Sequence, residues 1–331
     1  MRILFFLACL VVCLPTAARA EHIKIGILKT TASGPIFIAS AKGYFAAEGL
    51  EDELVFFASA QPIAVATASG AIDFGNAGFT GGFYGLAGDG ALRIISGGAS
   101  EVPGYHNQAF LASNKAWGAG LRSLKDMPGH SFAVSQIGSP PHYAMGLAAQ
   151  KYGFDLKSVR ILPLQSIPAT EAALIGGQAD ASGATGSLAG GILARGEAKL
   201  LGYMGDETPY QLSGTFASRK TADERSDTVR RFLRGLEKGY RDYDAAFIQN
   251  GNRHDGPTAP EMLAIVAKGT GQTPADTARG LPYIDAKGRL DIADVIRQYE
   301  WYKAQGMIKG AATPEAIIDR RYVVGLEKRS Q

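Results

Sequence analysis

Short β-forming runs alternate with helix-forming runs through the first two thirds of the chain, and this alternation constrains the fold more than any other feature. Apolar runs suited to strands occur at residues 23–28, 54–57, 92–96 and 109–112, separated by Gly- or Pro-marked loops and helical patterns. Such an order is typical of α/β proteins with largely parallel sheets. The last third is mainly helical, with helices predicted over residues 225–249, 260–268 and 292–305.

The pattern A-x-x-x-G-x-x-D occurs twice, at residues 66–73 and 173–180, each time between a predicted helix and a predicted short strand. Gly70 and Gly177 suit a left-handed helix end, and Asp73 and Asp180 start the next strand. Three matching residues are compatible with chance, but their identical setting favours two similar α/β lobes. The length of 331 residues also allows about two compact domains.

The N-terminus has the features of a secretory signal peptide. Arg2 gives it a positive start, residues 3–14 are apolar, and Ala18-Arg19-Ala20 is an A-x-A cleavage site. The apolar run is shorter than the roughly 20 residues that span a bilayer, so a membrane anchor is the less favoured interpretation. We therefore expect cleavage after Ala20 and an exported mature protein that begins at Glu21.

Composition narrows the class of protein further. Both cysteines, Cys9 and Cys13, lie in the predicted signal peptide, so the mature chain would have neither disulfides nor thiol chemistry. Without Arg2 and Arg19 the 34 basic residues become 32, against 31 acidic ones, a net charge of +1. That balance does not indicate nucleic acid or an anionic membrane as a partner.

Gly- or Ser-rich turns follow predicted strands and precede predicted helices at residues 30–34, 77–81, 136–139 and 183–187. In open parallel sheets ligands bind at the carboxyl ends of the strands, where helix N-termini present free N–H groups. Each turn taken alone is explained as well by an N-cap or a tight turn. As a set, they predict one site for a small polar or anionic group. The ligand-binding candidates from these turns are Thr31, Ser33, Gly34, Thr80, Gln136, Gly138, Ser139 and Thr185.

Aromatic and histidine side chains near the same turns complete the list of candidates. His142 stands in the first turn of the helix that Ser139 is expected to cap, where a positive helix end favours neutral imidazole. Tyr105 and His106 precede the strand that enters the middle block, and Tyr210 precedes the strand that leaves it. Phe79 is a candidate cleft aromatic, although phenylalanine is more often a core residue. A solvated loop or a supporting role remains an alternative for the histidines and tyrosines.

No catalytic or metal-binding motif accompanies these candidates. The sequence has no G-x-S-x-G, H-E-x-x-H or Walker loop, and its five histidines are scattered. We expect no catalytic residue, no metal and no cofactor, although a triad can assemble from remote positions.

The chain resembles the periplasmic substrate-binding proteins of ABC importers, in the nitrate/taurine/alkanesulfonate group. The resemblance covers nearly all of the expected mature chain and depends on the order and spacing of several loose motifs. It departs from the group at Met127-Pro128, where a Leu usually precedes Gly, and at His130, where Lys is frequent. The motifs are AKGYFAAEGL at 41–50, the repeat at 66–73, LKDMPGH at 124–130, Gly138-Ser139, and EAALIGGQADA at 171–181.

The resemblance implies a type II periplasmic-binding fold, in which two α/β lobes joined by two crossing strands enclose a ligand cleft. Lobe 1 would comprise residues 21–112 and 218–331, and lobe 2 residues 113–217, with crossings near 113–120 and 218–220. It implies a monomer that passes a small organic ligand, a sulfonate or carboxylate and possibly aromatic, to a membrane permease. A periplasmic sensor module and an enzyme on the same fold, of the pyrimidine-precursor or menaquinone-pathway type, remain alternatives.

Overall fold

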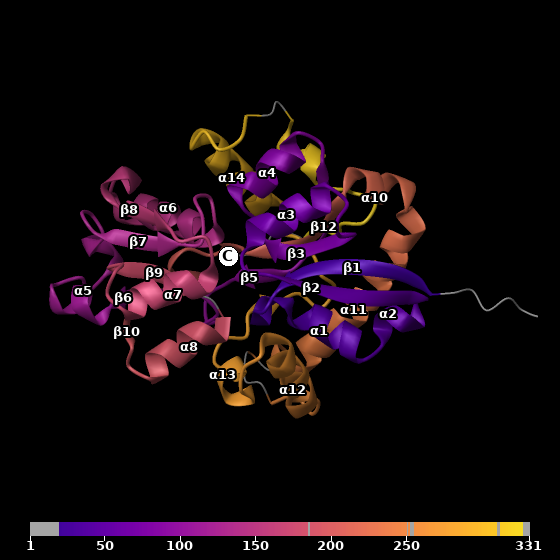
Figure 1. Cartoon of the computed structure of the whole chain (residues 1–331), viewed down its shortest axis with the longest axis horizontal. Helices are drawn as coiled ribbons and strands as arrows, with labels where there is room; N and C mark the ends of the chain where they lie inside the picture. Colours follow the sequence, from indigo (N-terminus) through magenta and orange to yellow (C-terminus); the bar gives the residue numbers. More distant parts are fainter. Residues whose placement is uncertain (1–19, 185, 250, 252–254, 310–311, 327–331) are drawn as a thin grey trace, which may run out of the picture.

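Two five-stranded sheets, each covered by helices, form the two halves of the molecule (Figure 1). The computed structural model describes residues 20–184, 186–249, 251, 255–309 and 312–326. The predicted signal peptide, apart from Ala20, and Thr185 lie outside the described residues. No helix among the described residues is long and apolar enough to cross a membrane.

The first sheet has the strand order β2-β1-β3-β12-β4. Strand β1 pairs in parallel with β2 and β3, whereas β12 runs antiparallel to β3 and β4. The prediction of largely parallel sheets therefore holds in this sheet only for β1, β2 and β3. Its strands are β1 (Glu21–Leu28), β2 (Leu50–Phe57), β3 (Phe74–Gly78), β4 (Leu92–Gly97) and β12 (Ser213–Ser218).

The second sheet repeats this plan with the order β10-β6-β9-β7-β8. Strand β7 is parallel to β8 and β9, and β6 is antiparallel to β9 and β10. The two sheets thus share a parallel core with an antiparallel strand beside it, and this common plan agrees with the two similar lobes that the repeated sequence pattern predicts. Its strands are β6 (Ala109–Ser113), β7 (Ser131–Val134), β8 (Arg160–Pro163), β9 (Ala181–Ala184) and β10 (Ala198–Tyr203).

The two copies of A-x-x-x-G-x-x-D occupy equivalent places in the two sheets. Gly70 and Gly177 have φ angles of 77° and 66°, in the left-handed region that favours glycine. The Asp73 carboxylate accepts the Lys24 N–H of β1 at 2.8 Å, and the Asp180 carboxylate accepts the Ser131 N–H of β7 at 2.8 Å. In each lobe the aspartate therefore fixes the start of one parallel strand to its neighbour, and the prediction of two similar lobes is confirmed.

The chain crosses between the sheets twice, and the two crossing segments pair with each other. After β4, strand β5 (Ala99–Glu101) leads toward β6, and β11 (Tyr210–Gln211) leads back to β12. Both belong to a small sheet, β11-β5-β13, that β13 (Tyr283–Ile284) completes. The sequence places these crossings near residues 113–120 and 218–220. The structure places both earlier in the chain, because β6 already belongs to the second sheet and β12 to the first.

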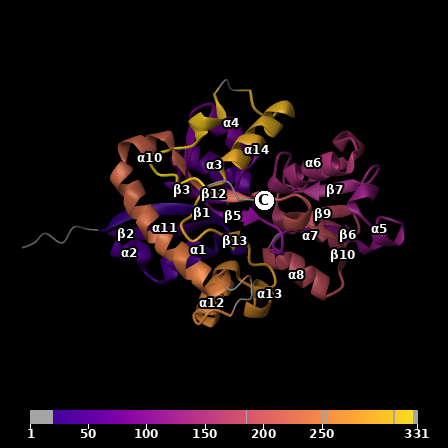
Figure 2. The same ribbon diagram turned by 180° about the vertical axis from the view of Figure 1, so that it is seen from behind.

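Helices cover both faces of each sheet, and C-terminal helices return to the first lobe (Figures 1 and 2). Figure 2 shows the long helix α11 lying across the first sheet beside α1 and α2. Its Phe232 stacks on Phe74 of β3 with ring centroids 4.0 Å apart, and this contact anchors the C-terminal third to the sheet. The helices of the first lobe before the crossing are η1 (Thr31–Ser33), α1 (Gly34–Ala41), α2 (Tyr44–Ala47), α3 (Ala60–Ala68) and α4 (Gly81–Gly88).

The remaining helices follow the same division. Those of the second lobe are α5 (Asn114–Gly118), η2 (Leu124–Asp126), α6 (Pro140–Tyr152), η3 (Leu156–Ser158), α7 (Ile167–Ile175), α8 (Gly186–Ala194) and α9 (Met204–Glu207). The C-terminal ones are α10 (Arg219–Glu224), α11 (Ser226–Phe247), α12 (Ala259–Thr270), α13 (Pro274–Ala278), α14 (Ile292–Ala304) and η4 (Pro314–Ile317). The predicted C-terminal helices correspond to α11, α12 and α14.

Strand β3 is placed differently from the sequence-based expectation. The sequence predicts a short strand near residues 72–74 with a Gly-rich turn from residue 76, but β3 runs over Phe74–Gly78. Glycine is required at position 75 because a Cβ there would lie 2.3 Å from the Phe216 ring of β12 and 2.7 Å from Thr67 Oγ1. Pairing with β1 and β12, rather than β propensity, therefore determines this strand.

Candidate functional site

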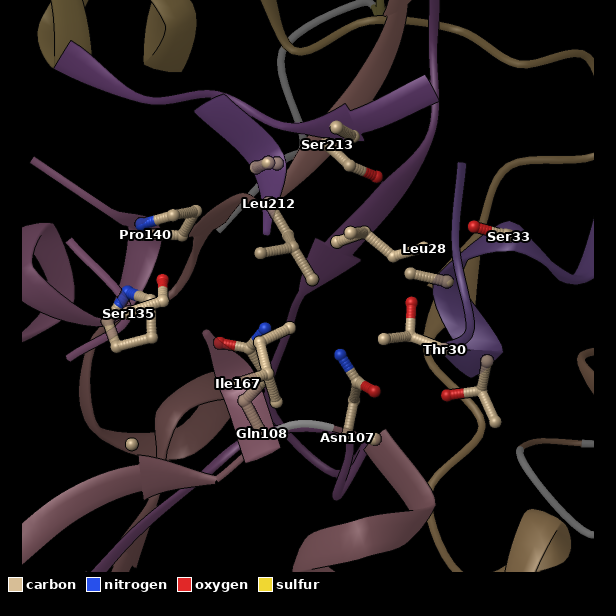
Figure 3. Close-up of a pocket in the computed structure, with 18 of the residues that line it drawn as sticks. Leu28, Thr30, Ser33, Asn107, Gln108, Ser135, Pro140, Ile167, Leu212 and Ser213 are labelled. Carbon is tan, nitrogen blue, oxygen red and sulfur yellow. The ribbon is translucent and has the colours of Figure 1, made fainter. Parts of the chain in front are cut away.

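A cavity of about 740 Å³, counted with the solvent space at its mouth, lies between the two lobes (Figure 3). Leu28, Gly78 and Val134 end parallel strands at its edge, and Gly183 lies in the last half of β9. Because carboxyl ends of parallel strands in both sheets face the same space, loops from both lobes meet there. The lining residues are Leu28, Thr30, Thr31, Ala32, Ser33, Ala60, Asn76, Ala77, Gly78, Asn107, Gln108, Val134, Ser135, Pro140, Pro141, Ile167, Thr170, Gly183, Gly186, Leu212 and Ser213.

Helix N-termini from both lobes contribute to the wall of this cavity. Ala60, Pro140, Ile167 and Gly186 are the first residues of α3, α6, α7 and α8. Each helix directs the positive end of its dipole, about half an elementary charge, toward the cavity. The arrangement favours an anionic group on a bound molecule, even where the N–H groups themselves are occupied.

Proline and capping bonds decide which of these helices offers N–H donors. Pro140 and Pro141 have no N–H, so the first two positions of α6 give an apolar surface. At α7 the Ile167 N–H donates to Ala58 O at 3.3 Å, and the Ala169 N–H donates to the Ser166 hydroxyl at 3.2 Å. The first turn of α3 has no side-chain cap from Ser59. The N-terminus of α3 is therefore better placed than that of α6 or α7 to donate N–H groups to a ligand.

The lining is neutral. Among the described residues that border the cavity, none is Asp, Glu, Lys, Arg or His. Hydroxyl groups of Thr30, Ser33, Ser135 and Ser213 alternate with apolar groups such as Leu28 and Leu212 (Figure 3). A site of this kind can surround an organic molecule and stabilise one anionic group with dipoles rather than with a counter-ion.

Contacts between the lobes close the cavity at its borders. The Gly81 N–H at the start of α4 donates to Gly138 O of the second lobe at 2.9 Å. A second bond between the lobes runs from the Ile167 N–H at the start of α7 to Ala58 O of the first lobe, at 3.3 Å. The first-lobe helix α14 also packs on α6, where the Trp301 ring stands at 80° to the Tyr143 ring with centroids 5.2 Å apart. The structure is thus a closed arrangement of the two lobes.

Of the ligand-binding residues predicted from the sequence, Thr31 and Ser33 line the cavity. Gly34 follows them as the first residue of α1 and is buried against Tyr243, which a Cβ at position 34 would approach to 2.9 Å. Thr185 lies outside the described residues. Its neighbour Gly186 lines the cavity, and the direct role of Thr185 stays a prediction.

The turn at residues 136–139 lies at the border between the lobes rather than in the cavity wall. Gly138 donates its N–H to His142 Nδ1 at 2.9 Å while its carbonyl accepts from Gly81. Burial lowers the pKa of His142 to about 4, in line with the expected neutral imidazole, which here accepts through Nδ1. Gln136 Nε2 and Ser139 Oγ are buried without a hydrogen-bond partner among the described residues. These residues position the border contact, and ligand contact by them stays a prediction.

Phe79 and Thr80 make structural contacts within the first lobe. Phe79 is fully buried and stacks on Phe83 at 5.1 Å, so it is a core residue, which was the alternative interpretation of its sequence. Thr80 caps α4 by accepting the Phe83 N–H at 2.9 Å, and its own hydroxyl donates to Gln61 at 2.6 Å. These bonds give Thr80 a structural role that does not require a ligand.

The aromatic residues of the crossing segments lie behind or beside the cavity. Tyr210 is buried, and its hydroxyl donates to Gln108 Oε1 at 3.1 Å, so it holds a residue that lines the cavity. Tyr105 packs edge-on against Tyr283 at 5.3 Å. His106 is half exposed, stacks on Tyr203 at 3.9 Å and lies 3.6 Å from Asp206. For His106 the structure agrees with the alternative of a solvated loop contact.

The sequence-based prediction missed Asn107 and Gln108, which enter the cavity from the crossing segment between β5 and β6. Figure 3 shows both side chains beside Ile167 and below Leu212. Asn107 Nδ2 donates to Glu101 Oε1 at 2.5 Å, and Asn107 Oδ1 is buried without a partner among the described residues. Burial raises the pKa of Glu101 to about 7. The run of polar residues at 105–108 was the available signal, but the prediction selected Tyr105 and His106 from it.

Comparisons with known proteins agree with this architecture. A family model described as NMT1/THI5 like matches residues 30–245. No curated protein sequence matches the chain. The alkanesulfonate-binding protein SsuA from Xanthomonas axonopodis pv. citri, bound to MOPS, has a similar structure, with a TM-score of 0.72 at 20% identity over 92% of this chain and 99% of that one.

Two further solved structures are similar over comparable lengths. The Candida albicans CA3427 gene product, described as exhibiting the generic periplasmic binding protein structural fold, gives a TM-score of 0.70 at 15% identity, covering 94% of this chain and 100% of that one. The periplasmic nitrate-binding protein NrtA from Synechocystis PCC 6803 gives 0.70 at 13% identity, covering 90% of this chain and 85% of that one. The two-lobed periplasmic-binding fold expected from the sequence is thereby confirmed.

Proposed function

The chain belongs to the NMT1/THI5-like family, and from that premise we propose that it is a periplasmic solute-binding protein that delivers a small organic anion to an ABC importer. The observation that carries the proposal is the convergence of helix N-termini from both lobes on one neutral cavity. A ligand that touches both lobes stabilises their closed arrangement, and a closed arrangement is a surface that a permease can recognise.

The lining of the cavity supports an organic ligand with one anionic group. Apolar side chains with a few hydroxyl and amide groups among them are typical of small-molecule sites. A bare inorganic anion would leave its apolar wall, including Leu28, Val134 and Leu212, without contacts. Sulfonates and carboxylates, aliphatic or aromatic, supply both an anionic group and apolar surface. One structural neighbour is an alkanesulfonate-binding protein bound to MOPS, and alkanesulfonates belong to this class of ligand.

Export and processing form the second part of the proposal. The N-terminal segment has the features of a signal peptide cleaved after Ala20, and β1 begins at the next residue, Glu21. The mature protein would act as a monomer with no catalytic role. Its chain would pass from one lobe to the other within residues 98–108 and return within residues 204–212. Mass spectrometry of protein recovered from the periplasm should give a chain that starts at Glu21. A mass that retains residues 1–20 would contradict the processing step.

The binding role is tested by thermal unfolding of the mature protein with sulfonates, aliphatic and aromatic carboxylates, nitrate and pyrimidines. A ligand that binds only the folded state raises the melting temperature in a saturable way. Ala60→Trp places a large side chain at the cavity end of α3 and should abolish the rise. Val65→Trp is the matched control, because Val65 lies on the same helix and is 51% exposed. Equal ligand responses in the two variants would refute this cavity as the site.

A further inference from the structure

A buried side-chain oxygen in the cavity wall makes no hydrogen bond within the described part of the chain. Asn107 is 1% exposed and lines the cavity, and its Oδ1 has no partner among the described residues. A Cβ placed on Gly186, at the start of α8, would lie 3.8 Å from this oxygen, which places it beside the α8 wall. A buried acceptor without a donor is unfavourable. A ligand that brings an N–H or O–H to this point would satisfy it.

The orientation of the Asn107 amide is set by a carboxyl group behind it. Asn107 Nδ2 lies 2.5 Å from Glu101 Oε1, and Glu101 is 1% exposed. When Glu101 is ionised it only accepts hydrogen bonds, so the amide must turn its NH₂ toward Glu101 and its oxygen away. When Glu101 is protonated it can donate to the amide oxygen, and the amide can then turn its NH₂ toward the cavity.

Other groups around Glu101 do not compete for this role. The second carboxylate oxygen accepts the Gln108 N–H at 3.4 Å. The titratable groups on the elements packed against β5 are Asp206 and Glu207 of α9, Tyr210 of β11 and Tyr283 of β13. Glu207 is paired with Lys151 at 2.6 Å, and Asp206 lies 3.6 Å from His106. Asp206 adds negative charge near Glu101 and so favours the protonated carboxyl.

We propose that Asn107 selects ligands that carry a hydrogen-bond donor in addition to their anionic group, and that Glu101 sets this selectivity by orienting the Asn107 amide. The inference rests on the proposed solute-binding function and deepens it. It names the ligand class as amino-, amido- or hydroxy-substituted sulfonates or carboxylates, bound with the anion toward the helix N-termini and the donor toward Asn107.

The protonation of Glu101 makes this selectivity dependent on pH. Burial raises its pKa to about 7, so the carboxyl is ionised above that pH and protonated below it. Above pH 7 the cavity presents an acceptor, and ligands with a donor are preferred. Below pH 6 the amide can turn, and the preference for a donor should decline while the attraction of the helix N-termini for the anion persists.

The experiment measures binding by calorimetry for pairs of anions that differ only in the donor. Suitable pairs are 2-aminoethanesulfonate with ethanesulfonate, and 4-hydroxybenzoate with benzoate, each at pH 8 and pH 5.5. In at least one pair, the donor-bearing member should bind about tenfold more tightly at pH 8. This advantage should shrink to less than about threefold at pH 5.5.

Glu101→Gln is the informative variant, because it keeps the shape and removes the titration. The neutral Gln can accept from the NH₂ group of Asn107 or donate to its amide oxygen, at either pH. The difference in donor preference between the two pH values should therefore vanish. The double variant Glu101→Gln/Asn107→Leu should lose the donor preference at both pH values, and it leaves no buried carboxylate unpaired. Asn114→Ala, at an exposed position in α5, is the control and should behave as wild type.

The outcomes separate this inference from the function beneath it. Equal affinities within every pair at pH 8, or a preference that survives in the double variant, would overturn the role of Asn107 while anion binding stands. A preference that keeps its pH dependence in Glu101→Gln would overturn the role of Glu101. Absence of binding by both members of all pairs, and by the wider panel, would overturn the proposed function and this inference with it.

Discussion

Replacing Gly138 by alanine should weaken lobe closure more than it weakens the fold of either lobe. Gly138 has a φ of +78°, where a side chain costs about 1–2 kcal/mol. A Cβ would lie 3.2 Å from Gly81 N and 3.0 Å from Met307 Sδ, both on the first lobe. The Gly81 N–H to Gly138 O bond would lengthen, which adds about 0.5–1.5 kcal/mol against the closed arrangement.

Gly153 provides the matched control for the cost of placing a side chain at a positive φ angle. It has a φ of +75° at the C-terminus of α6, and a Cβ there would meet nothing within 4 Å. Gly153→Ala should therefore cost about 1–2 kcal/mol in urea unfolding, like the backbone part of Gly138→Ala. Only Gly138→Ala should lower the affinity for the ligand that the panel identifies, by about twofold to tenfold, and enlarge the radius of gyration in X-ray scattering. Equal affinities and equal scattering for the two variants would refute the border contact as a determinant of closure.

Three further perturbations follow from the contacts described above. His142→Asn should keep an acceptor for the Gly138 N–H without titrating. Burial lowers the pKa of His142 from about 6.5 to about 4, because the folded state favours the neutral imidazole. Its contribution to the free energy of unfolding is therefore complete above pH 6.5 and falls by about 3 kcal/mol as the pH drops to 4. The unfolding free energy of wild type minus variant, in which the contribution of Glu101 cancels, should follow this fall. A difference independent of pH would contradict it. Gly146→Ala should place a Cβ 2.4 Å from the Trp301 ring and reduce ligand affinity about tenfold, despite a better helix propensity. Gly118→Ala in α5, where nothing lies within 4 Å, should leave affinity unchanged, and equal affinities in the two variants would exclude α6–α14 packing from closure. Arg225→Met should break the pair with Glu21 at 2.6 Å and the pair with Asp73, at a cost of about 1 kcal/mol in urea unfolding. The loss should shrink in 1 M salt, and a loss that salt does not change would show that the charges are not its cause.

Local signals in the sequence determined much of the fold. The alternation of strands and helices specified an α/β protein, because each segment carries its own hydrophobic period and its own turn residues. Gly70 and Gly177 with Asp73 and Asp180 specified two equivalent lobes, since both the left-handed turn and the aspartate bond act over short distances. The turn at residues 30–34 identified a part of the cavity wall for the same reason.

Tertiary structure alone decided the rest of the site. Asn107 and Gln108 reach the cavity because the two crossing segments pair in the small sheet β11-β5-β13, a contact between residues about a hundred positions apart in the chain. The N–H of Ile167 is unavailable because Ala58 of the other lobe accepts it. The sequence could show that helices begin at the cavity, but not which N–H groups remain free there or which buried acid orients Asn107. Those properties arise only when the two lobes close and bring distant donors and acceptors within hydrogen-bond distance.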